Sequence, residues 1–270
     1  MHLNREDYEE PRCLLNMHPE TQRIPVKRVT DRLDVLLGKK DYDGAVRLLD
    51  NWAREARDLR DSQGELSILN EQIGLYRKLD KKPECLNAIE GALKLLEELQ
   101  MEDTVTGGTT LVNAATGYKA AGEPLQALPL YRRAREIYEK RLEEGDDRLA
   151  ALYNNMALAL AETGEYGEAA ELYEKAIGVL QKKEGNEPEI AITYLNMADL
   201  LAEQEGCEAA AGRIDEFLDR AEQLLDSETI PRNGYYAFVC EKCAPGFYCY
   251  GHFSAGEKLE KRAEEIYERA

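Results

Sequence analysis

Small apolar residues recur along the chain with a period of 40 to 42 residues. Two columns of them are Ala115, Ala157 and Ala198, and Ala127, Ala169 and Ala210. Bulkier residues repeat with them, since Tyr131 and Tyr173 each follow an alanine of the second column by four positions. Five such units follow one another, and self-similarity at a fixed period is the signature of a repeat architecture.

Within one unit the repeated residues are spaced for helices. Ala115 and Tyr118 are three positions apart, Ala127 and Tyr131 are four apart, and Ala134 follows three later, so each set lies on one helix face. The sequence shows no strand pattern. We predict five pairs of helices, at residues 26–39 and 42–60, 64–79 and 83–100, 105–121 and 124–142, 147–163 and 166–184, and 188–204 and 207–226.

Turn-forming residues separate the two helices of a pair. Gly122 and Gly164 follow the first helix, where a residue in the left-handed conformation commonly ends a helix. Pro83 and Pro124 stand in the first turn of the second helix, where a missing backbone N–H is tolerated. In other units the linking position is taken by Lys40, Asp80 and Glu205.

The two ends of the chain depart from this period. Residues 1–25 contain Pro11, Pro19 and Pro25 without helical spacing, so we expect an irregular N-terminal arm. Residues 231–270 are expected to form a sixth, atypical capping pair, whose last helix has the polar outer face that terminal repeats require. The Pro245-Gly246 dipeptide should kink the penultimate helix or end it early.

The repeated residues resemble the pattern of the tetratricopeptide repeat family. The match covers residues 26–226 and is most specific at Tyr118, Ala127, Tyr131, Ala134, Ala157, Gly164, Ala169, Tyr173 and Ala176. The period exceeds the family's usual length of about 34 residues, and it resembles the longer-helix variant of kinesin light chains and bacterial peptide-sensing regulators. The resemblance implies an all-α, right-handed superhelical solenoid of antiparallel helix pairs, with a concave groove lined by the first helices.

The charge of the chain narrows the classes of partner. Charged residues make up 33% of the sequence, and 53 Asp and Glu against 35 Lys and Arg give a formal charge of −18. Such an acidic surface repels phosphate, which argues against nucleic acid and against anionic membranes. No apolar stretch approaches the roughly 20 residues that cross a bilayer, and the polar start MHLNREDYEE lacks the apolar segment of a secretory signal. We therefore expect a soluble, cytoplasmic protein.

The sequence contains none of the common catalytic motifs. It has no Gly-rich phosphate loop, no HExxH and no GxSxG, and it has only three histidines. The carboxylates alternate with Lys and Arg, as is typical of solvated helix surfaces. We predict that the protein is not an enzyme and needs no cofactor.

The most specific candidate for a binding site is a column of asparagines. Asn113, Asn155 and Asn196 share one repeat position, two residues before the small residue of the first helix. In tetratricopeptide folds this face lines the groove, and a side-chain amide both donates to and accepts from a peptide backbone. Neighbouring helices lie about 8–10 Å apart and an extended chain advances about 3.3 Å per residue, so one asparagine can meet every third ligand residue. Alternatively, the asparagines bond to each other or to backbone between helices.

Charged residues near the same face add a weaker signal. Positive side chains in the second and third units are Arg77, Lys78 and Lys119, and negative ones in the fourth and fifth are Glu162, Asp199 and Glu203. A ligand with opposite charges at its ends would fit this distribution, which solvated faces also show. The predicted peptide-binding residues are therefore Asn113, Asn155, Asn196, Lys119, Glu162, Asp199 and Arg77.

Three cysteines and a histidine near the C-terminal end have the ligand types of a zinc site. They are Cys240, Cys243, Cys249 and His252. Their spacing is tight for a structural zinc loop, and Cys243 falls where the repeat requires a core residue, so we favour buried free thiols and predict no metal site. The other cysteines, Cys13, Cys85 and Cys207, are isolated and are expected to be small apolar residues or surface thiols.

Aromatic residues are concentrated in the same region. They are Tyr235, Tyr236, Phe238, Phe247, Tyr248, Tyr250 and Phe253. Two interpretations stay open: a capping core, or an aromatic pocket or subunit contact.

These patterns together predict a protein- or peptide-binding module that captures an extended segment of its partner in the concave groove. The alternative is a structural scaffold that self-associates through its convex face or its aromatic C-terminal end. No enzymatic or DNA-binding domain is expected beside the repeats, and the sequence does not identify the partner.

Overall fold

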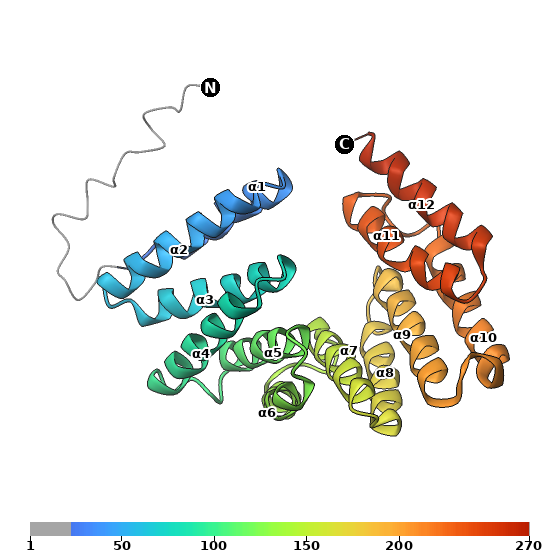
Figure 1. Ribbon diagram of the computed structural model, residues 1–270, viewed down its shortest axis with the longest axis horizontal. Helices are drawn as coiled ribbons and strands as arrows, with labels where there is room; N and C mark the ends of the chain where they lie inside the picture. Colours follow the sequence, from blue (N-terminus) through green and yellow to red (C-terminus); the bar gives the residue numbers. More distant parts are fainter. Residues whose placement is uncertain (1–22, 270) are drawn as a thin grey trace. The chain divides into compact units, whose positions relative to one another are not determined.

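The computed structural model describes residues 23–269, of which 81% are helical. The described range contains no strand, and its twelve helices (Figure 1) confirm the predicted all-α class. They are α1 (Val26–Gly38), α2 (Tyr42–Asp58), α3 (Ser62–Lys78), α4 (Lys82–Glu98), α5 (Val105–Ala120), α6 (Pro124–Arg141), α7 (Asp147–Glu162), α8 (Tyr166–Leu180), α9 (Glu187–Glu205), α10 (Cys207–Asp226), α11 (Gly234–Cys249) and α12 (Phe253–Tyr267). Across this range, no helix combines the length and low charge of a membrane-spanning segment.

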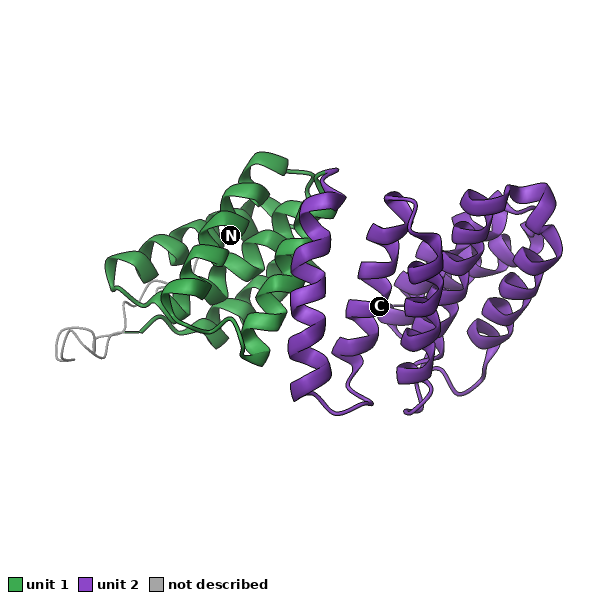
Figure 2. Cartoon of the chain, turned by 90° about the horizontal axis from the view of Figure 1, so that it is seen from below, with its two compact units in different colours: residues 1–121 green, residues 122–270 purple. Residues whose placement is uncertain are grey.

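The helices divide into two compact units (Figure 2). Unit 1 comprises residues 1–121 and contains α1 to α5, and unit 2 comprises residues 122–270 and contains α6 to α12. The boundary falls at Gly122, between the two helices that the repeat pattern assigns to the third pair. Most of the predicted N-terminal arm, residues 1–22, lies outside the described residues.

The ends of α1 to α10 lie close to those predicted from the period. The largest difference is at α8, which is expected to reach residue 184 and ends at Leu180. Of the two alternatives for Pro245-Gly246, a kink or an early helix end, the early end is wrong, because α11 continues through Pro245 to Cys249. Cys243, Ala244 and Phe247, on both sides of the proline, are buried in one hydrophobic core, and this packing offsets the lost backbone hydrogen bond.

Side-chain caps define the start of three helices of unit 1, and in unit 2 Asp146 and Asn233 cap α7 and α11. Asp41, Asp61 and Thr104 each accept a hydrogen bond from the backbone N–H three residues later, and in each case that residue is a glycine. Asp61 makes a second bond, since its carboxylate also accepts from the N–H of Ile24 at 2.9 Å in a buried position. This side chain therefore joins the start of the described chain to α3.

The turns between helices use different residues in the two units. In unit 1 the backbone enters the left-handed region at Lys40, Arg60, Asp80 and Gln100, with φ between 53° and 56°. In unit 2 this region is occupied by glycines such as Gly164, at φ 82°. The assignment of Glu205 to the linking position is wrong by one residue, because Gly206, at φ 87°, makes the turn between α9 and α10.

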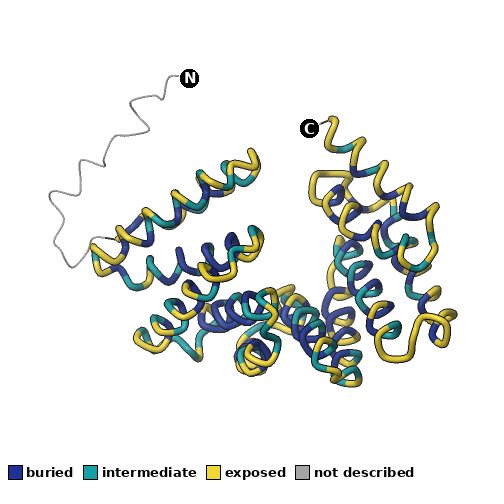
Figure 3. The backbone as a smooth tube through the Cα atoms, in the orientation of Figure 1, coloured by how far each residue is buried: buried dark blue, intermediate teal, exposed yellow. Residues whose placement is uncertain are grey.

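The repeated small residues form the core, as predicted. The alanines of both columns are at most 1% exposed, and so are Tyr131 and Tyr173. In Figure 3 the buried positions follow the helix faces that are turned toward other helices. Small side chains at these positions let neighbouring helices approach closely while the tyrosines fill the space between them.

The first helices of successive pairs pack side by side within each unit. In unit 1, α1 contacts α3 and α3 contacts α5, and in unit 2, α7 contacts α9 and α9 contacts α11. A second helix such as α8 packs against the first helix of its own pair and of the next. Eight exposed or half-buried residues of α7 and α9 recur at helical spacing and are here called the first-helix face of unit 2: Ala151, Asn155, Leu158, Glu162, Ile192, Asn196, Asp199 and Glu203.

Charged side chains join α10 to the last two helices. Arg262 of α12 lies 2.6 Å from Oδ1 of Asp226 and donates to the hydroxyl of Tyr236 at 3.0 Å. The guanidinium of Arg232 lies over the ring of Tyr236, 4.1 Å from its centroid. These contacts place positive charge at the C-terminal end of α10, where the helix dipole favours it.

Candidate functional site

The seven predicted peptide-binding residues are divided between the two units. Asn113, Lys119 and Arg77 lie in unit 1, and Asn155, Glu162, Asn196 and Asp199 lie in unit 2.

In unit 1, Asn113 takes part in a network between first helices. Its Nδ2 donates to Oδ1 of Asn70 at 2.8 Å, across α5 and α3. Nδ2 of Asn70 in turn donates to Oγ1 of Thr110 at 3.0 Å. Asn113 therefore bonds to an asparagine outside the predicted column, on the neighbouring first helix.

Unit 2 repeats part of this network with equivalent residues. Nδ2 of Asn154 in α7 donates to Oγ1 of Thr193 in α9 at 3.0 Å, as Asn70 does to Thr110. The bond from Asn113 to Asn70 has no counterpart, because Oδ1 of Asn154 is buried without a hydrogen-bond partner among the described residues. Sequence analysis missed Asn70 and Asn154, and their separation of two periods was the available signal.

Asn155 and Asn196 are not used to hold α7 and α9 together. Nδ2 of Asn155 donates within its own helix, to the carbonyl of Ala151 at 2.9 Å. Asn196 makes no side-chain hydrogen bond with any described residue, and it is half-buried. Both amides keep donor and acceptor capacity for another molecule.

The carboxylates of the first-helix face of unit 2 lie beside two tyrosines. The hydroxyl of Tyr250, which follows α11, donates to Oδ1 of Asp199 at 2.6 Å. Tyr173 of α8 is 1% exposed. Burial raises the pKa of Tyr173, and the nearby charges of Asp199, Glu203 and Glu162 raise it further. The three carboxylates therefore disfavour ionisation of the Tyr173 phenol.

The predicted basic residues of unit 1 lie at the ends of first helices. Lys78 lies over the ring of Tyr42, with Nζ 5.4 Å from the centroid. Arg77 and Lys119 occupy the last turns of α3 and α5. Lys78 is therefore engaged with α2.

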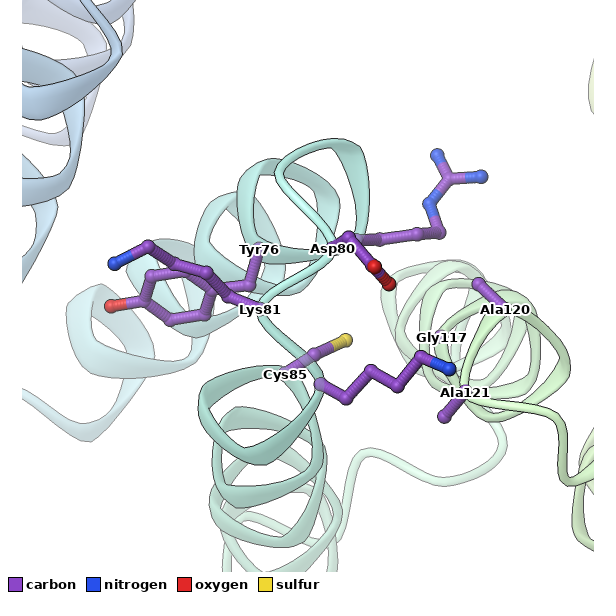
Figure 4. Close-up of a pocket in the computed structure, with 9 residues that line it drawn as sticks. Tyr76, Asp80, Lys81, Cys85, Gly117, Ala120 and Ala121 are labelled. Carbon is purple, nitrogen blue, oxygen red and sulfur yellow. The ribbon is translucent and has the colours of Figure 1, made fainter.

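A small cavity lies between the ends of α3, α4 and α5 (Figure 4). It is lined by Tyr76, Arg77, Asp80, Lys81, Lys82, Cys85, Gly117, Ala120 and Ala121. Its volume of about 10 Å³ is close to the minimum that holds one water molecule. Cys85 is buried against α5, where a Cβ on Gly117 would lie 3.2 Å from its Sγ, and burial raises the pKa of this thiol. The cavity is too small to receive a ligand side chain.

The C-terminal cysteines occupy different environments. Cys240 and Cys243 are buried, and Cys249 is exposed. Burial raises the pKa of Cys243 to about 12, which disfavours the thiolate that binds metal. His252 lies 3.1 Å from Oδ1 of Asp215. Over residues 23–269, no three His, Cys, Asp or Glu side chains form a group that could hold a metal ion; Cys13 lies outside the described residues.

The aromatic residues of the C-terminal region divide between core and surface. Tyr236 and Phe247 are buried, whereas Tyr235, Phe238 and Phe253 are more than half exposed. The hydroxyl of Tyr235 donates to Glu189 at 2.6 Å, which ties α11 to α9. The buried rings therefore fit the capping core, and the exposed rings fit an aromatic pocket or subunit contact.

The helix pairs define the class of the protein, an α-helical repeat protein without a strand in the described range. Residues 148–223 match the tetratricopeptide repeat family, in agreement with the resemblance predicted from the repeat pattern. A comparison with curated protein sequences gives no match.

Several solved structures share the fold. BtubC (BKLC) from P. vanneervenii superposes with a TM-score of 0.64 at 21% identity, covering 77% of this chain and 84% of that chain. A putative kinesin light chain from Podosopora anserina with nearly identical repeats superposes with a TM-score of 0.54 at 15% identity, over 74% and 94% of the chains. A Rap protein complexed with competence and sporulation factor gives a TM-score of 0.54 at 14% identity, over 93% and 78%. The predicted likeness to the longer repeats of kinesin light chains is confirmed at the level of fold.

Proposed function

We propose that the protein is a binding module that captures an extended segment of a partner protein on the first-helix face of unit 2. The observation that carries the proposal is the pair Asn155 and Asn196. They occupy one repeat position on two first helices in contact, α7 and α9, and neither amide is used to join those helices. Because α7 and α9 each present one side-chain amide, the pair suits an extended ligand whose backbone places one hydrogen-bonding group at each helix.

The neighbouring residues support binding to a segment in which side chains are also selected. Leu158 and Ile192 are half-buried apolar residues of the same face, and Glu162, Asp199 and Glu203 are exposed acids. Apolar contact with a few placed polar groups is the usual composition of a recognition surface. The absence of a catalytic motif from the sequence makes binding, rather than turnover, the function that fits.

The fold is compatible with this function. The Rap protein, a chain of similar fold, was solved in complex with competence and sporulation factor. In unit 1 the equivalent asparagine is engaged with Asn70, so we assign the ligand to unit 2. Asn113, Lys119 and Arg77 are assigned no ligand contact in this proposal.

A selection experiment with mapping tests the proposal. Peptides selected from a random display library on the full chain are offered to two variants with a photo-crosslinking amino acid. One replaces Leu158 on the first-helix face, and the other replaces Gly178, an exposed residue of α8 with open space around it. We expect crosslinks from position 158 and none from 178. Crosslinking from 178 alone, or no selected peptide, would contradict the proposal.

A further inference from the structure

The side-chain amide of Asn154 has a hydrogen-bond partner at only one of its two ends. Its Nδ2 donates to Oγ1 of Thr193, from α7 to α9, at 3.0 Å, but its Oδ1 is buried and has no partner among the described residues. A buried polar atom nearly always has a partner, because it has given up its bonds to water. The oxygen of Asn154 therefore needs a donor that this arrangement of the side chains does not supply.

The orientation of this amide is set by Thr193. The hydroxyl of Thr193 donates to the carbonyl of Glu189, one turn earlier in α9, at 2.8 Å. Because its only proton is used there, Oγ1 of Thr193 can only accept from Asn154. The donor end of the Asn154 amide therefore faces Thr193, and the acceptor end is the one that is left unpaired.

Unit 1 shows which residue can supply the donor. There Asn70 donates to Thr110 at 3.0 Å, and its Oδ1 accepts from Nδ2 of Asn113 at 2.8 Å. Asn113 follows Thr110 by three positions on α5. Asn196 has the same place on α9, three positions after Thr193, and its amide makes no hydrogen bond with any described residue. Asn196 is therefore the counterpart of the residue that completes the network in unit 1.

The two layers differ in how closely their first helices pack. The contact of α3 with α5 is more extensive than the contact of α7 with α9. A hydrogen bond needs its donor and acceptor within about 3.2 Å of each other, so the closer packing in unit 1 permits the bond that the looser packing in unit 2 leaves open. Closer approach of α7 and α9 would bring the amide of Asn196 to Oδ1 of Asn154.

We propose that Asn154 is a positioning residue, which orients Asn196 when a segment is bound. A segment that contacts both α7 and α9 draws these helices together, and Nδ2 of Asn196 then donates to Oδ1 of Asn154. Oδ1 of Asn196 is thereby turned to the segment, where it accepts a backbone N–H. The inference rests on the proposed function and adds to it the polarity of the contact, since α9 selects a hydrogen-bond donor.

Asn155 presents the same polarity on α7. Its Nδ2 donates to the carbonyl of Ala151 at 2.9 Å, and its Oδ1 accepts no hydrogen bond from the described residues. In the extended polyproline II conformation, N–H groups three residues apart lie on one side of the chain, about 9 Å from each other, and helices in contact are about 8–10 Å apart. The bound segment should therefore present two backbone N–H groups three residues apart, and proline, which has no N–H, should be excluded from both positions.

The first experiment determines this polarity from the side of the peptide. A peptide that is selected on the full chain and crosslinks at position 158 is resynthesised with one backbone amide at a time replaced by an ester, which removes the N–H without adding bulk. We expect two esters, three residues apart, to weaken binding by about 2- to 10-fold each, as for the loss of one hydrogen bond. A series in which no such pair has the largest effects would overturn the inference.

The second experiment tests Asn154 with a matched variant of unit 1. The ester that lies opposite α9 is the one whose penalty disappears in Asn196→Ala. We expect the same penalty to disappear in Asn154→Ala, because the Asn196 amide is then no longer oriented, while the ester opposite α7 keeps its effect. Asn70→Ala, which removes the equivalent acceptor from unit 1, should bind the whole series as wild type does.

A conservative variant separates orientation from general damage to the fold. Asn154→Asp keeps an acceptor for Asn196 and should keep the wild-type ester profile, with thermal melting of all variants measured alongside. Loss of the profile in Asn154→Asp and in Asn70→Ala alike would overturn the positioning role, because it would show that any disturbance of the helix layers has this effect.

The inference and the proposed function fail in different ways. A peptide that crosslinks at position 158 and has the same ester profile in wild type and in Asn154→Ala would leave the proposed function standing and refute the role of Asn154. A chain that selects no peptide would refute both.

Discussion

Nδ2 of Asn113 donates a hydrogen bond to Oδ1 of Asn70 at 2.8 Å, joining the first helices of two successive pairs. Asn196 occupies the same repeat position as Asn113 and makes no such bond to the described chain. One column of the repeat therefore holds a residue that ties helices together and a residue with a free amide. We therefore expect Asn113 to contribute to the stability of the fold and Asn196 to contribute to ligand binding.

Replacing these two asparagines should affect stability unequally. Asn113→Ala removes a bond from a half-buried network, so the free energy of unfolding should fall by about 0.5–1.5 kcal/mol. Asn196→Ala removes no bond within the described chain and should change stability by no more than about 0.5 kcal/mol. Urea unfolding followed by circular dichroism measures both. If Asn196→Ala were as destabilising as Asn113→Ala, the amide of Asn196 would not be free.

Two helix caps of unit 1 form a matched pair. Asp41 and Asp61 both cap a helix through the N–H of a glycine three residues later, but only Asp61 also binds Ile24 in a buried position. Asp41→Ala should cost about 1 kcal/mol, and Asp61→Ala should cost about 1–3 kcal/mol more, because a buried N–H is left unpaired. Equal midpoints of urea unfolding would show that the Ile24 bond adds nothing.

Substitutions at two turn residues, Gly164 and Gln100, should change the stability of the protein in opposite directions. Gly164 has a φ of 82°, which a side chain opposes, so Gly164→Ala should destabilise the protein by about 1–2 kcal/mol. Gln100 is a non-glycine residue at φ 53°, so Gln100→Gly removes the strain of a side chain in this conformation. Glycine also raises the entropy of the unfolded chain, which opposes this gain. The net change in stability should therefore lie between zero and an increase of about 1 kcal/mol. Thermal melting of both variants checks the signs, and a loss of stability in Gln100→Gly would contradict the account.

The cap of α7 should weaken in acid. The hydrogen bond from Arg148, opposed in part by burial, lowers the pKa of Asp146 from 3.8 to about 2. A depressed pKa stabilises the folded state above pH 3.8, and that contribution is lost as the pH falls from about 4 to about 2. Asp146→Asn keeps a cap but not the charge, so its deficit should be about 0.2–1 kcal/mol at pH 6, typical of exposed pairs, and should shrink toward pH 3. A deficit independent of pH would mean that the charge of Asp146 does not stabilise α7.

The period of the sequence was sufficient to predict the helices because the repeated positions are the core positions. Ala169 and Tyr173 recur since each repeat packs against the next in the same way, and both are buried. Local rules failed where packing opposes them: Pro245 lies inside α11 because Phe247 and Ala244 are held in the core. The linking residue between α9 and α10 was predicted one position too early, because Gly206 and not Glu205 makes the turn. The pattern of apolar positions does not mark the exact residue at which α9 ends.

The site was harder to predict because it depends on pairs of residues rather than on columns. Asn70 and Asn154 bond to Thr110 and Thr193, which stand at a different repeat position on the next first helix. A column-by-column comparison does not connect such partners. The effect of the carboxylates of α7 and α9 on the pKa of Tyr173 likewise requires the packing of three helices to be known.

The most direct test of the account is a binding titration with a selected peptide. Wild type is compared with Asn155→Ala/Asn196→Ala and with a control, Asn51→Ala/Asn87→Ala, which removes two exposed asparagines of second helices. Each ligand-contacting asparagine supplies up to two hydrogen bonds of about 0.5–1.5 kcal/mol, so each loss weakens binding by about 5- to 150-fold. We expect the first variant, which lacks both asparagines, to lose at least this much affinity with its unfolding midpoint unchanged, and the control to keep wild-type affinity. Equal affinity of all three proteins for the peptide would contradict this expectation.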